Sequence, residues 1–348
     1  MSSLMLYGVF TVIVAVLLAI DLFVVHRNTH AVSLKEAGLW TAVWVSVSVL
    51  FGLFMPQFYH GADSEDMILY FTAYVVEWSL SVDNVMIFVL IFQTFAVPKE
   101  FQHRVLFYGV LGAIVMRVAV ILAGVALVKQ FEWVLYVFGV FLLYLAWKTW
   151  VHRGEIENVA DSRLMKVIRR VLPTTDDYRG EHFVVREQGR LLATPLLMVL
   201  VMVNVVDLIF ATDSIPAVFA ITRDPFIVVT SNIFAILGLR ALYFLIAGLA
   251  DRLYYLKAGL AIILAFVGLK LLTENIERIW HPSPVQSLGI IALILAVVVI
   301  MSWLRDRKVS AQSVPAAENQ IAERRQLFPA EAIQPHSEQD RTHRRERN

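Results

Sequence analysis

The 348-residue sequence contains no cysteine. Disulfide bonds, thiolate metal ligands and thiol redox chemistry are therefore excluded, and with them the usual ligands of soft metals. Charged residues are also scarce, at 17% of the chain, against about 25% in soluble domains. The formal net charge of +1 gives no reason to expect nucleic acid as a partner.

Apolar residues are correspondingly abundant: 58% of the chain is hydrophobic and the mean hydropathy is +0.67. This composition predicts an all-α polytopic membrane protein whose surroundings are the lipid bilayer. Runs of about 20 apolar residues are long enough to span a bilayer. The sequence has about nine of them, at 4–25, 38–55, 67–95, 105–127, 132–150, 192–221, 226–247, 255–273 and 286–304.

The distribution of Lys and Arg predicts the orientation. Basic residues gather after the first, third, fifth, seventh and ninth spans, with Arg104, Lys257 and Arg305 as examples. Loops rich in Lys and Arg stay in the cytoplasm. We therefore expect the N-terminus outside and the C-terminus in the cytoplasm.

Two segments outside the spans have their own patterns. In the 153–191 loop, residues 161–172 place apolar side chains on one helical face and basic ones on the other. This pattern fits a helix on an anionic membrane surface or an ordinary solvated connector, and the loop is a candidate contact for cytoplasmic or membrane partners. Residues 309–348 are polar, which predicts a disordered cytoplasmic tail.

Four acidic residues lie deep inside the apolar spans. Glu77 and Asp83 occur in the third span and Asp207 and Asp213 in the sixth, with the same spacing of six. A carboxylate at the bilayer centre costs about 2.5–3.5 kcal/mol on insertion scales, so such residues usually have a function.

The two acidic segments belong to an internal repeat. Residues 77–84 align with 207–214, Arg117 aligns with Arg240, and Lys148 with Lys270. Each unit has three helices, so the second enters the membrane from the opposite side, which predicts an inverted repeat of spans 3–5 and 6–8. The expected organisation is two N-terminal helices in 1–65, repeats in 66–152 and 192–274 around the 153–191 loop, a last span in 275–308, and the tail.

Positions six apart on a straight helix differ by about 240° in azimuth, so the acids of each pair would not share a face. A helix break would let them converge. Pro216 lacks an N–H group and leaves the Thr212 carbonyl without its donor, which predicts a break there. In the first repeat we expect the break near Ser81–Asn84.

The charges of these helices favour a divalent cation. Four carboxylates against Arg117 and Arg240 leave two negative charges, and further oxygen ligands come from the Asn84 and Asn204 amides, the Ser214 hydroxyl and the Thr212 carbonyl. Oxygen ligands favour manganese, magnesium or calcium. Two alternatives remain: the Arg–carboxylate pairs hold the helices together, or the acids relay protons. Asp21, near the end of the first span, is an interfacial acid or a weaker ligand.

Residues 76–85, 206–218, 222–227 and 231–240 closely resemble the TerC family of membrane proteins, and within it the Alx-like branch, over about residues 5–305. The resemblance implies a bacterial inner-membrane protein associated with tellurium resistance and with efflux of divalent metals, chiefly manganese. It implies site residues at Glu77, Asp83, Asn84, Asp207, Asp213 and Ser214. The chain has Trp78 where the family commonly has Lys, and Asn204 where it commonly has Glu. We hypothesise that relatives carry an ion pair at these two positions and that both members are neutral here.

Together these patterns predict an exporter of manganese or another hard divalent cation. No permanent cofactor is expected; Mn²⁺ is the transported ion, and proton exchange is a candidate driving force. The sequence has no nucleophile–base arrangement, phosphate loop or cofactor motif, so an enzyme is not predicted. The alternatives are a non-transporting membrane scaffold for tellurium or envelope stress partners, and an exporter of an organic cation.

Overall fold

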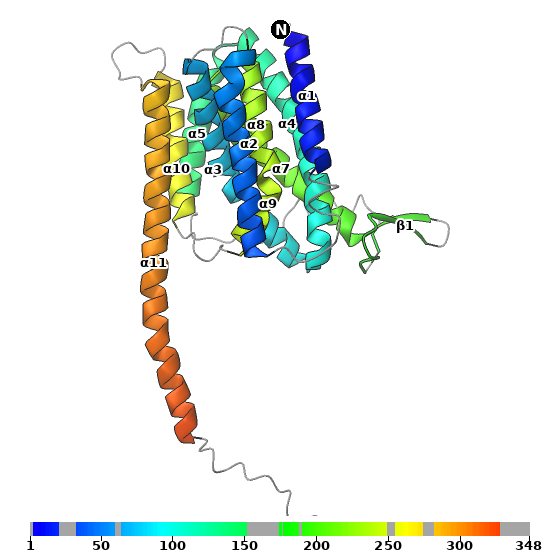
Figure 1. Ribbon diagram of the computed structural model, residues 1–348, viewed down its shortest axis with the longest axis vertical. Coiled ribbons are helices and arrows are strands. Elements are labelled where there is room, and N and C mark those ends of the chain that lie inside the picture. The colour runs from blue at the N-terminus through cyan, green and yellow to red at the C-terminus, as the bar shows by residue number, and fades with distance from the viewer. Residues whose placement is uncertain are drawn as a thin grey trace, which may run out of the picture. The chain divides into compact units, whose positions relative to one another are not determined.

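The computed structural model describes residues 3–20, 33–59, 64–151, 174–175, 177–187, 190–248, 255–273 and 282–327. The described residues form an all-α membrane protein with one small hairpin (Figure 1). The helices are α1 (Ser3–Ile20), α2 (Leu34–Phe58), α3 (Ser64–Thr94), α4 (Lys99–Gln130), α5 (Val134–Val151), α7 (Pro195–Phe219), α8 (Pro225–Leu237), α9 (Leu239–Ala247), α10 (Leu256–Thr273) and α11 (Pro284–Leu327).

Seven of the described helices are long and apolar enough to cross a membrane, or eight if the bent pair α8–α9 counts as one span. The N-terminal helix α1 contributes a shorter apolar stretch, Met5–Ile20. Each predicted span therefore coincides with an apolar helix or helix pair. The polytopic fold is confirmed, whereas the count of nine stays a prediction.

The predicted helix breaks are absent from α3 and α7. α3 is continuous through Ser81–Asn84, and α7 continues through Pro216 to Phe219. Pro216 lies in the last turn of α7, and the helix continues past it to Phe219 with the loss of one backbone hydrogen bond, that to the Thr212 carbonyl. The interruption lies instead at Gly238, where α8 and α9 meet at 43°.

The start of α8 is fixed by a cap and by a contact with α2. Asp224 is the N-cap, and its carboxylate accepts hydrogen bonds from the N–H groups of Phe226 (2.8 Å) and Ile227 (3.1 Å). Pro225 occupies the first helical position, where its missing N–H costs nothing. The Tyr59 hydroxyl, at the end of α2, donates a 2.5 Å hydrogen bond to the same carboxylate.

The described helices within Met1–Val299 belong to one compact unit and pack against each other in pairs. α5 packs against α10, α3 against α8, and α4 against α7, while α3 and α7 also contact each other. α5 and α10 approach closely because glycines face each other: a Cβ on Gly268 would lie 3.1 Å from the Gly139 carbonyl oxygen. Small residues of this kind let membrane helices pack backbone to backbone.

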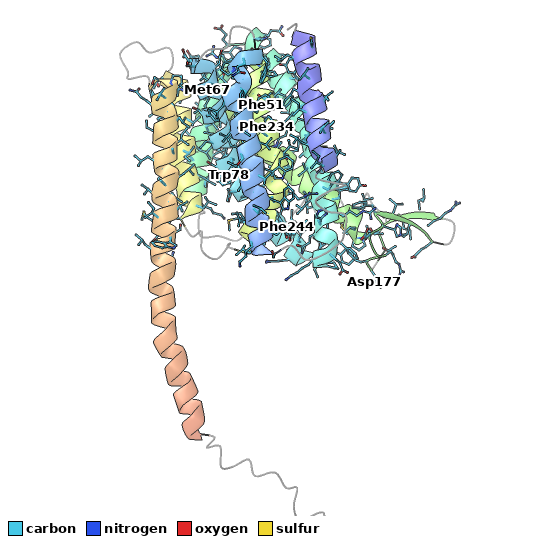
Figure 2. All side chains as sticks on the ribbon, viewed as in Figure 1. Phe51, Met67, Trp78, Asp177, Phe234 and Phe244 are labelled. Atoms are coloured by element: carbon cyan, nitrogen blue, oxygen red, sulfur yellow. The ribbon has the colours of Figure 1, made fainter. Side chains whose placement is uncertain are left out.

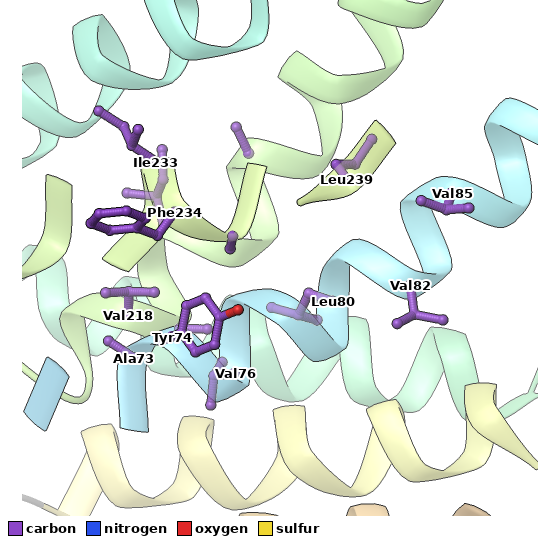
Figure 3. Packing of buried hydrophobic residues seen from close by; sticks show 14 of the residues in the cluster. Ala73, Tyr74, Val76, Leu80, Val82, Val85, Val218, Ile233, Phe234 and Leu239 are labelled. Atoms are coloured by element: carbon purple, nitrogen blue, oxygen red, sulfur yellow. The ribbon is translucent and has the colours of Figure 1, made fainter. Parts of the chain in front are cut away.

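A continuous apolar core surrounds the middle of α3. Ala73, Val76 and Leu80 of α3 pack with Val218 of α7 and Phe234 of α8 (Figure 3). All five are buried. These helices therefore form the centre of this part of the molecule, and polar side chains on their inner faces are shielded from lipid and from water.

Two sequence-based expectations outside the spans have different outcomes. The predicted surface helix at 161–172 lies outside the described residues. Further along the same loop, β1 (Val184–Glu187) and β2 (Arg190–Ala193) form an antiparallel hairpin. α11 continues to Leu327, so the prediction of disorder is wrong for 309–327; the run of Ala, Glu, Gln and Arg there favours helix. Residues 328–348 lie outside the described residues.

Candidate functional site

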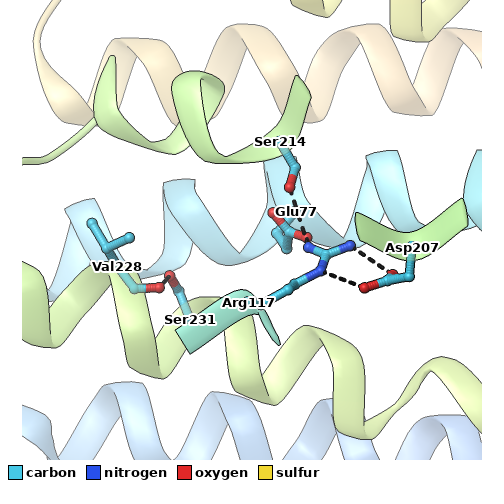
Figure 4. A network of polar contacts seen from close by, with 6 residues as sticks. All are labelled: Glu77, Arg117, Asp207, Ser214, Val228 and Ser231. Atoms are coloured by element: carbon cyan, nitrogen blue, oxygen red, sulfur yellow. Dashed lines mark hydrogen bonds and ion pairs between the residues drawn. The ribbon is translucent and has the colours of Figure 1, made fainter. Parts of the chain in front are cut away.

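Arg117 is the centre of a buried polar cluster (Figure 4). Its Nε and Nη2 donate to the two carboxylate oxygens of Asp207 at 3.0 and 2.9 Å. Its Nη1 donates to Glu77 Oε1 and, at 3.2 Å, to the hydroxyl of Ser214. The guanidinium thus connects three helices, because Arg117 belongs to α4, Glu77 to α3, and Asp207 and Ser214 to α7.

The cluster is sealed from solvent and lies at mid-height of the bundle. Arg117 and Glu77 are 0% exposed, and Asp207 and Ser214 are 1% exposed. In Figure 2, Trp78, which follows Glu77 in the chain, lies between Met67 near one end of the bundle and Phe244 near the other. Buried charges of this kind are stable only when they are paired and hydrogen-bonded.

The cluster has more acid than base. Glu77 and Asp207 carry two negative charges when ionised, and Arg117 supplies one positive charge. Asp207 satisfies both of its oxygens on the guanidinium, whereas Glu77 Oε2 has no hydrogen-bond partner among the described residues. One proton or one further cation would therefore neutralise the cluster.

A second acidic pair lies next to the first. Asp213 of α7 interacts electrostatically with Asp83 of α3, and also with Lys148 of α5 and Arg117. The Thr212 hydroxyl lies 3.1 Å from Asp213 Oδ1 and 2.6 Å from the Ile209 carbonyl oxygen. Acids from both predicted repeats thus come within electrostatic range of each other and of the arginine.

The other predicted site residues have separate environments. Asn84 is 3% exposed, and its Nδ2 has no hydrogen-bond partner among the described residues. Asn204 Nδ2 donates to the Leu200 carbonyl at 2.9 Å, while its Oδ1 faces Gly112. The Arg240 guanidinium lies 5.9 Å from the centre of the Phe107 ring. Pro216 lacks an N–H, so the Thr212 carbonyl has no i+4 backbone donor. Asp21 lies outside the described residues.

The described residues contain no group of three His, Cys, Asp or Glu side chains that could hold a metal ion. The acids lie instead as two neighbouring pairs, Glu77 with Asp207 and Asp83 with Asp213. A cation held here would take its remaining ligands from neutral oxygens, such as the Asn84 and Ser214 side chains.

Lys148, near the end of α5, is exposed and interacts electrostatically with Asp213. Sequence reasoning did not place it among the site residues, although it aligns with Lys270 in the repeat. Lys270 itself donates a 3.4 Å hydrogen bond to Ser287 of α11.

The fold and the cluster define a class: a polytopic α-helical membrane protein with paired charges buried between its helices. A model of the integral membrane protein TerC family matches residues 62–310, and this chain belongs to that family.

Relatives of similar length support the assignment. The chain is 46% identical over 319 residues to the Salmonella typhi protein named "Putative membrane-bound redox modulator Alx", covering 88% of this chain and 98% of the relative. A protein of the same name from Escherichia coli K12 is 46% identical over 310 residues, covering 87% and 96% of the two chains. An uncharacterized membrane protein of Myxococcus xanthus, STKORF319, is 43% identical over 311 residues, covering 89% and 96%. No solved structure matches the chain significantly.

Proposed function

We propose that the protein exports a hard divalent cation, with manganese as the first candidate. The observation that carries the proposal is that acids of two spanning helices gather around Arg117: Glu77 of α3 and Asp207 of α7 both bind its guanidinium, and Asp213 of α7 interacts electrostatically with Asp83 of α3. Carboxylates brought together in a low-dielectric region repel unless protons or cations compensate their charge. A transported cation would occupy such a place for part of its cycle.

The Arg117 cluster offsets part of the negative charge of the site. Arg117 binds Glu77 and Asp207, and Glu77 retains an oxygen that can accept a cation or a proton. In the proposed cycle, the cation binds Asp83 and Asp213 with oxygens from Asn84, Ser214 and Thr212. Protons taken up on release would drive the exchange, which is how proton relays in transporters use intramembrane acids.

Alternating access would use the predicted inverted repeat. In this repeat α3 corresponds to α7, α4 to α8–α9, and α5 to α10. The contact of α3 with α8 then corresponds to the contact of α7 with α4, and the α5–α10 contact corresponds to itself. Buried small residues support the same pairing. Gly139 of α5 corresponds to Ala261 of α10, and Ala146 of α5 corresponds to Gly268 of α10. The sequence separation within each of these pairs equals that between Lys148 and Lys270. Rocking of one repeat against the other is the motion such folds use.

The proposed direction is from the cytoplasm to the outside, across the plasma membrane of a bacterium. The basic loops support an external N-terminus and a cytoplasmic C-terminus. The three relatives come from bacteria. Reporter fusions at the two termini measure this orientation directly.

The test is the metal content of cells that express Asp83→Asn or Asp213→Asn. Both variants should lose manganese tolerance and accumulate intracellular manganese, because neutral amides replace the charged ligands. Glu132→Gln, in the exposed turn between α4 and α5, is the matched control and should behave like the unaltered protein. Normal tolerance and normal manganese content in both Asn strains would contradict the proposal.

The name of the Alx relatives suggests a link to redox state. In this chain such a link cannot use thiols, since cysteine is absent. Removal of redox-active manganese would give a thiol-free protein an indirect effect on redox state. A scaffold acting through the 153–191 loop is the second candidate: deleting the loop should abolish a scaffold's effect and leave metal export intact.

A further inference from the structure

One face of α3 carries three buried polar side chains: Glu77, Ser81 and Asn84. Their spacing of four and three residues places them within an arc of about 60° on the helix surface. Glu77 and Ser81 are 0% exposed and Asn84 is 3% exposed. Glu77 Oε2, Ser81 Oγ and Asn84 Nδ2 have no hydrogen-bond partner among the described residues.

The opposite face of the same helix is different. Ser79 is equally buried, at 1% exposed, but its hydroxyl donates a 2.5 Å hydrogen bond to the Val75 carbonyl. The helix therefore satisfies a serine on one face and leaves a serine unsatisfied on the other. A polar group without a partner at membrane depth costs several kcal/mol, and ordered water is the usual partner of such groups in protein interiors.

The unsatisfied face points along α3 toward a cavity. Phe88 and Phe92 continue the same arc beyond Asn84, and Phe92 lines a cavity of about 600 Å³. Phe244, another lining residue, lies near one end of the bundle (Figure 2). Polar side chains of this cavity include Gln93, Lys99 and Gln102.

A small void lies beside the arginine cluster. It measures about 10 Å³, and both Phe88 and Asp207 line it. That volume is about the minimum for one water molecule. Phe88 therefore faces a space that touches the Arg117 cluster, on the same side of α3 as Asn84.

A ring contact and two side-chain hydrogen bonds stabilise the inner wall of the large cavity. The Phe92 ring meets the Tyr243 ring edge to face at 5.1 Å between centroids. The Tyr243 hydroxyl donates a 3.0 Å hydrogen bond to Gln102 Oε1, and Gln102 Nε2 donates to the Val97 carbonyl at 3.0 Å. These contacts join α3, α4 and α9 around the aromatic pair.

We propose that this face of α3 is a hydrated route for cations between the large cavity and Glu77. Ser81 and Asn84 supply oxygen and amide contacts along it, and Phe88 and Phe92 form its apolar constriction. The proposal rests on the proposed function and adds the path that an ion would follow. The cavity end carries Lys99, so it lies on the side predicted to be cytoplasmic, where an exporter loads its ion.

The absence of cysteine makes the route directly measurable. Ser81→Cys and Ser79→Cys each introduce one thiol into the full chain at nearly the same depth, and both substitutions are close to isosteric. Vesicles holding each variant are treated with a membrane-impermeant trimethylammonium methanethiosulfonate, applied to the side of the cavity, and modification is followed by mass. Gln93→Cys, in the exposed part of the cavity lining, is the positive control.

The route predicts that Ser81→Cys is modified faster than Ser79→Cys on the order of tenfold, since such reagents need an accessible thiolate. Adding Phe92→Ala should increase the Ser81→Cys rate further. Equal rates at the two positions, or no reaction at Ser81→Cys while Gln93→Cys reacts, would overturn the route. If Ser81→Cys fails to fold, Asn84→Cys is the equivalent variant on the same face.

Labelling and metal tolerance separate the two proposals. If Ser81→Cys is labelled while Asp83→Asn and Asp213→Asn handle manganese normally, the result supports the hydrated route and contradicts the manganese function. If the Asn variants lose manganese tolerance but Ser81→Cys is not labelled preferentially, the result supports the function and contradicts the route.

Discussion

Arg117 and Asp207 join α4 to α7 through two parallel hydrogen bonds, of 3.0 and 2.9 Å. This two-pronged contact uses the planar fork of the guanidinium, which a lysine cannot reproduce. Glu77 takes the remaining nitrogen of the fork, so a single side chain of α4 fixes α3 and α7 together. Four consequences of the structure can be measured.

Removing Arg117 should be strongly destabilising. Arg117→Gln would leave Glu77 and Asp207 as buried acids without a cation, which typically costs about 3–5 kcal/mol. The thermal unfolding midpoint of the purified protein in detergent measures the loss. Arg179→Ala is the control, because it removes a half-exposed pair with Glu187 at 3.0 Å and should cost less than about 1 kcal/mol. Similar losses in the two variants would show that burial does not set the strength of the Arg117 contacts.

Gly268→Ala should push α5 and α10 apart. The added Cβ would lie 3.0 Å from Leu142 Cβ and 3.1 Å from the Gly139 carbonyl oxygen, and both belong to the facing helix. Overpacking of this kind usually costs about 1–3 kcal/mol. Gly289→Ala in α11 is the matched control: its Cβ meets nothing within 4 Å, so the change should be neutral or slightly stabilising. Thermal unfolding of both variants decides the point, and equal midpoints would contradict it.

Ala96→Gly should stabilise the protein. Ala96 lies in the turn that follows α3, with φ at 48°, a left-handed conformation that costs an L-residue about 1–2 kcal/mol and costs glycine almost nothing. The extra backbone entropy of glycine in the unfolded chain offsets part of the gain, which leaves up to about 1 kcal/mol. Ala113→Gly, inside α4, should lower the midpoint by a similar amount. A lower midpoint for Ala96→Gly would show that the turn relaxes around alanine.

Tyr178 should stabilise the folded protein at neutral pH, and this contribution to the free energy of unfolding should be lost in alkali. Its hydroxyl donates a 2.7 Å hydrogen bond to the Phe95 carbonyl, and burial raises the pKa of Tyr178 to about 12. The unfolded pKa is about 10, so the contribution is complete below pH 10 and is lost as the pH rises toward 12.

Tyr178→Phe should therefore lower stability by about 1 kcal/mol at pH 8, the usual value of one hydrogen bond. The difference from the unaltered protein should shrink near pH 12. Unfolding midpoints at the two pH values measure it, and a difference that does not change with pH would contradict the assignment.

The sequence predicted the helices well, because a helix that crosses a bilayer needs about 20 consecutive apolar residues, and such runs are visible in a sequence. Every predicted span coincides with a helix or helix pair of the described structure. The hairpin at Val184–Ala193 was not predicted, since its four-residue strands are too short to show a clear alternation. The bend at Gly238 was missed for a similar reason, because one glycine inside an apolar run has no distinct signature.

The sequence singled out acids that the structure brings near one another, but it did not give their pairing with the arginines. The spacing of the acids identified Glu77, Asp83, Asp207 and Asp213, and the arginine as a partner was one of the open alternatives. Sequence alone could not show that Arg117 takes both Glu77 and Asp207 while Arg240 lies over Phe107. Such choices depend on side-chain positions across helices, which a linear pattern does not contain. The prediction of a break at Pro216 was wrong, because α7 tolerates the loss of one backbone hydrogen bond there and continues to Phe219.

The buried arginine also constrains how the protein is made. α4 enters the membrane during translation with a cation at its centre, at a cost of about 2.5–3.5 kcal/mol. Glu77 has already been synthesised by then, but Asp207 follows Arg117 by 90 residues. We therefore expect α3 and α4 to insert as a hairpin with one ion pair already formed. The nascent chain would then wait for α7 before the remaining charge is matched.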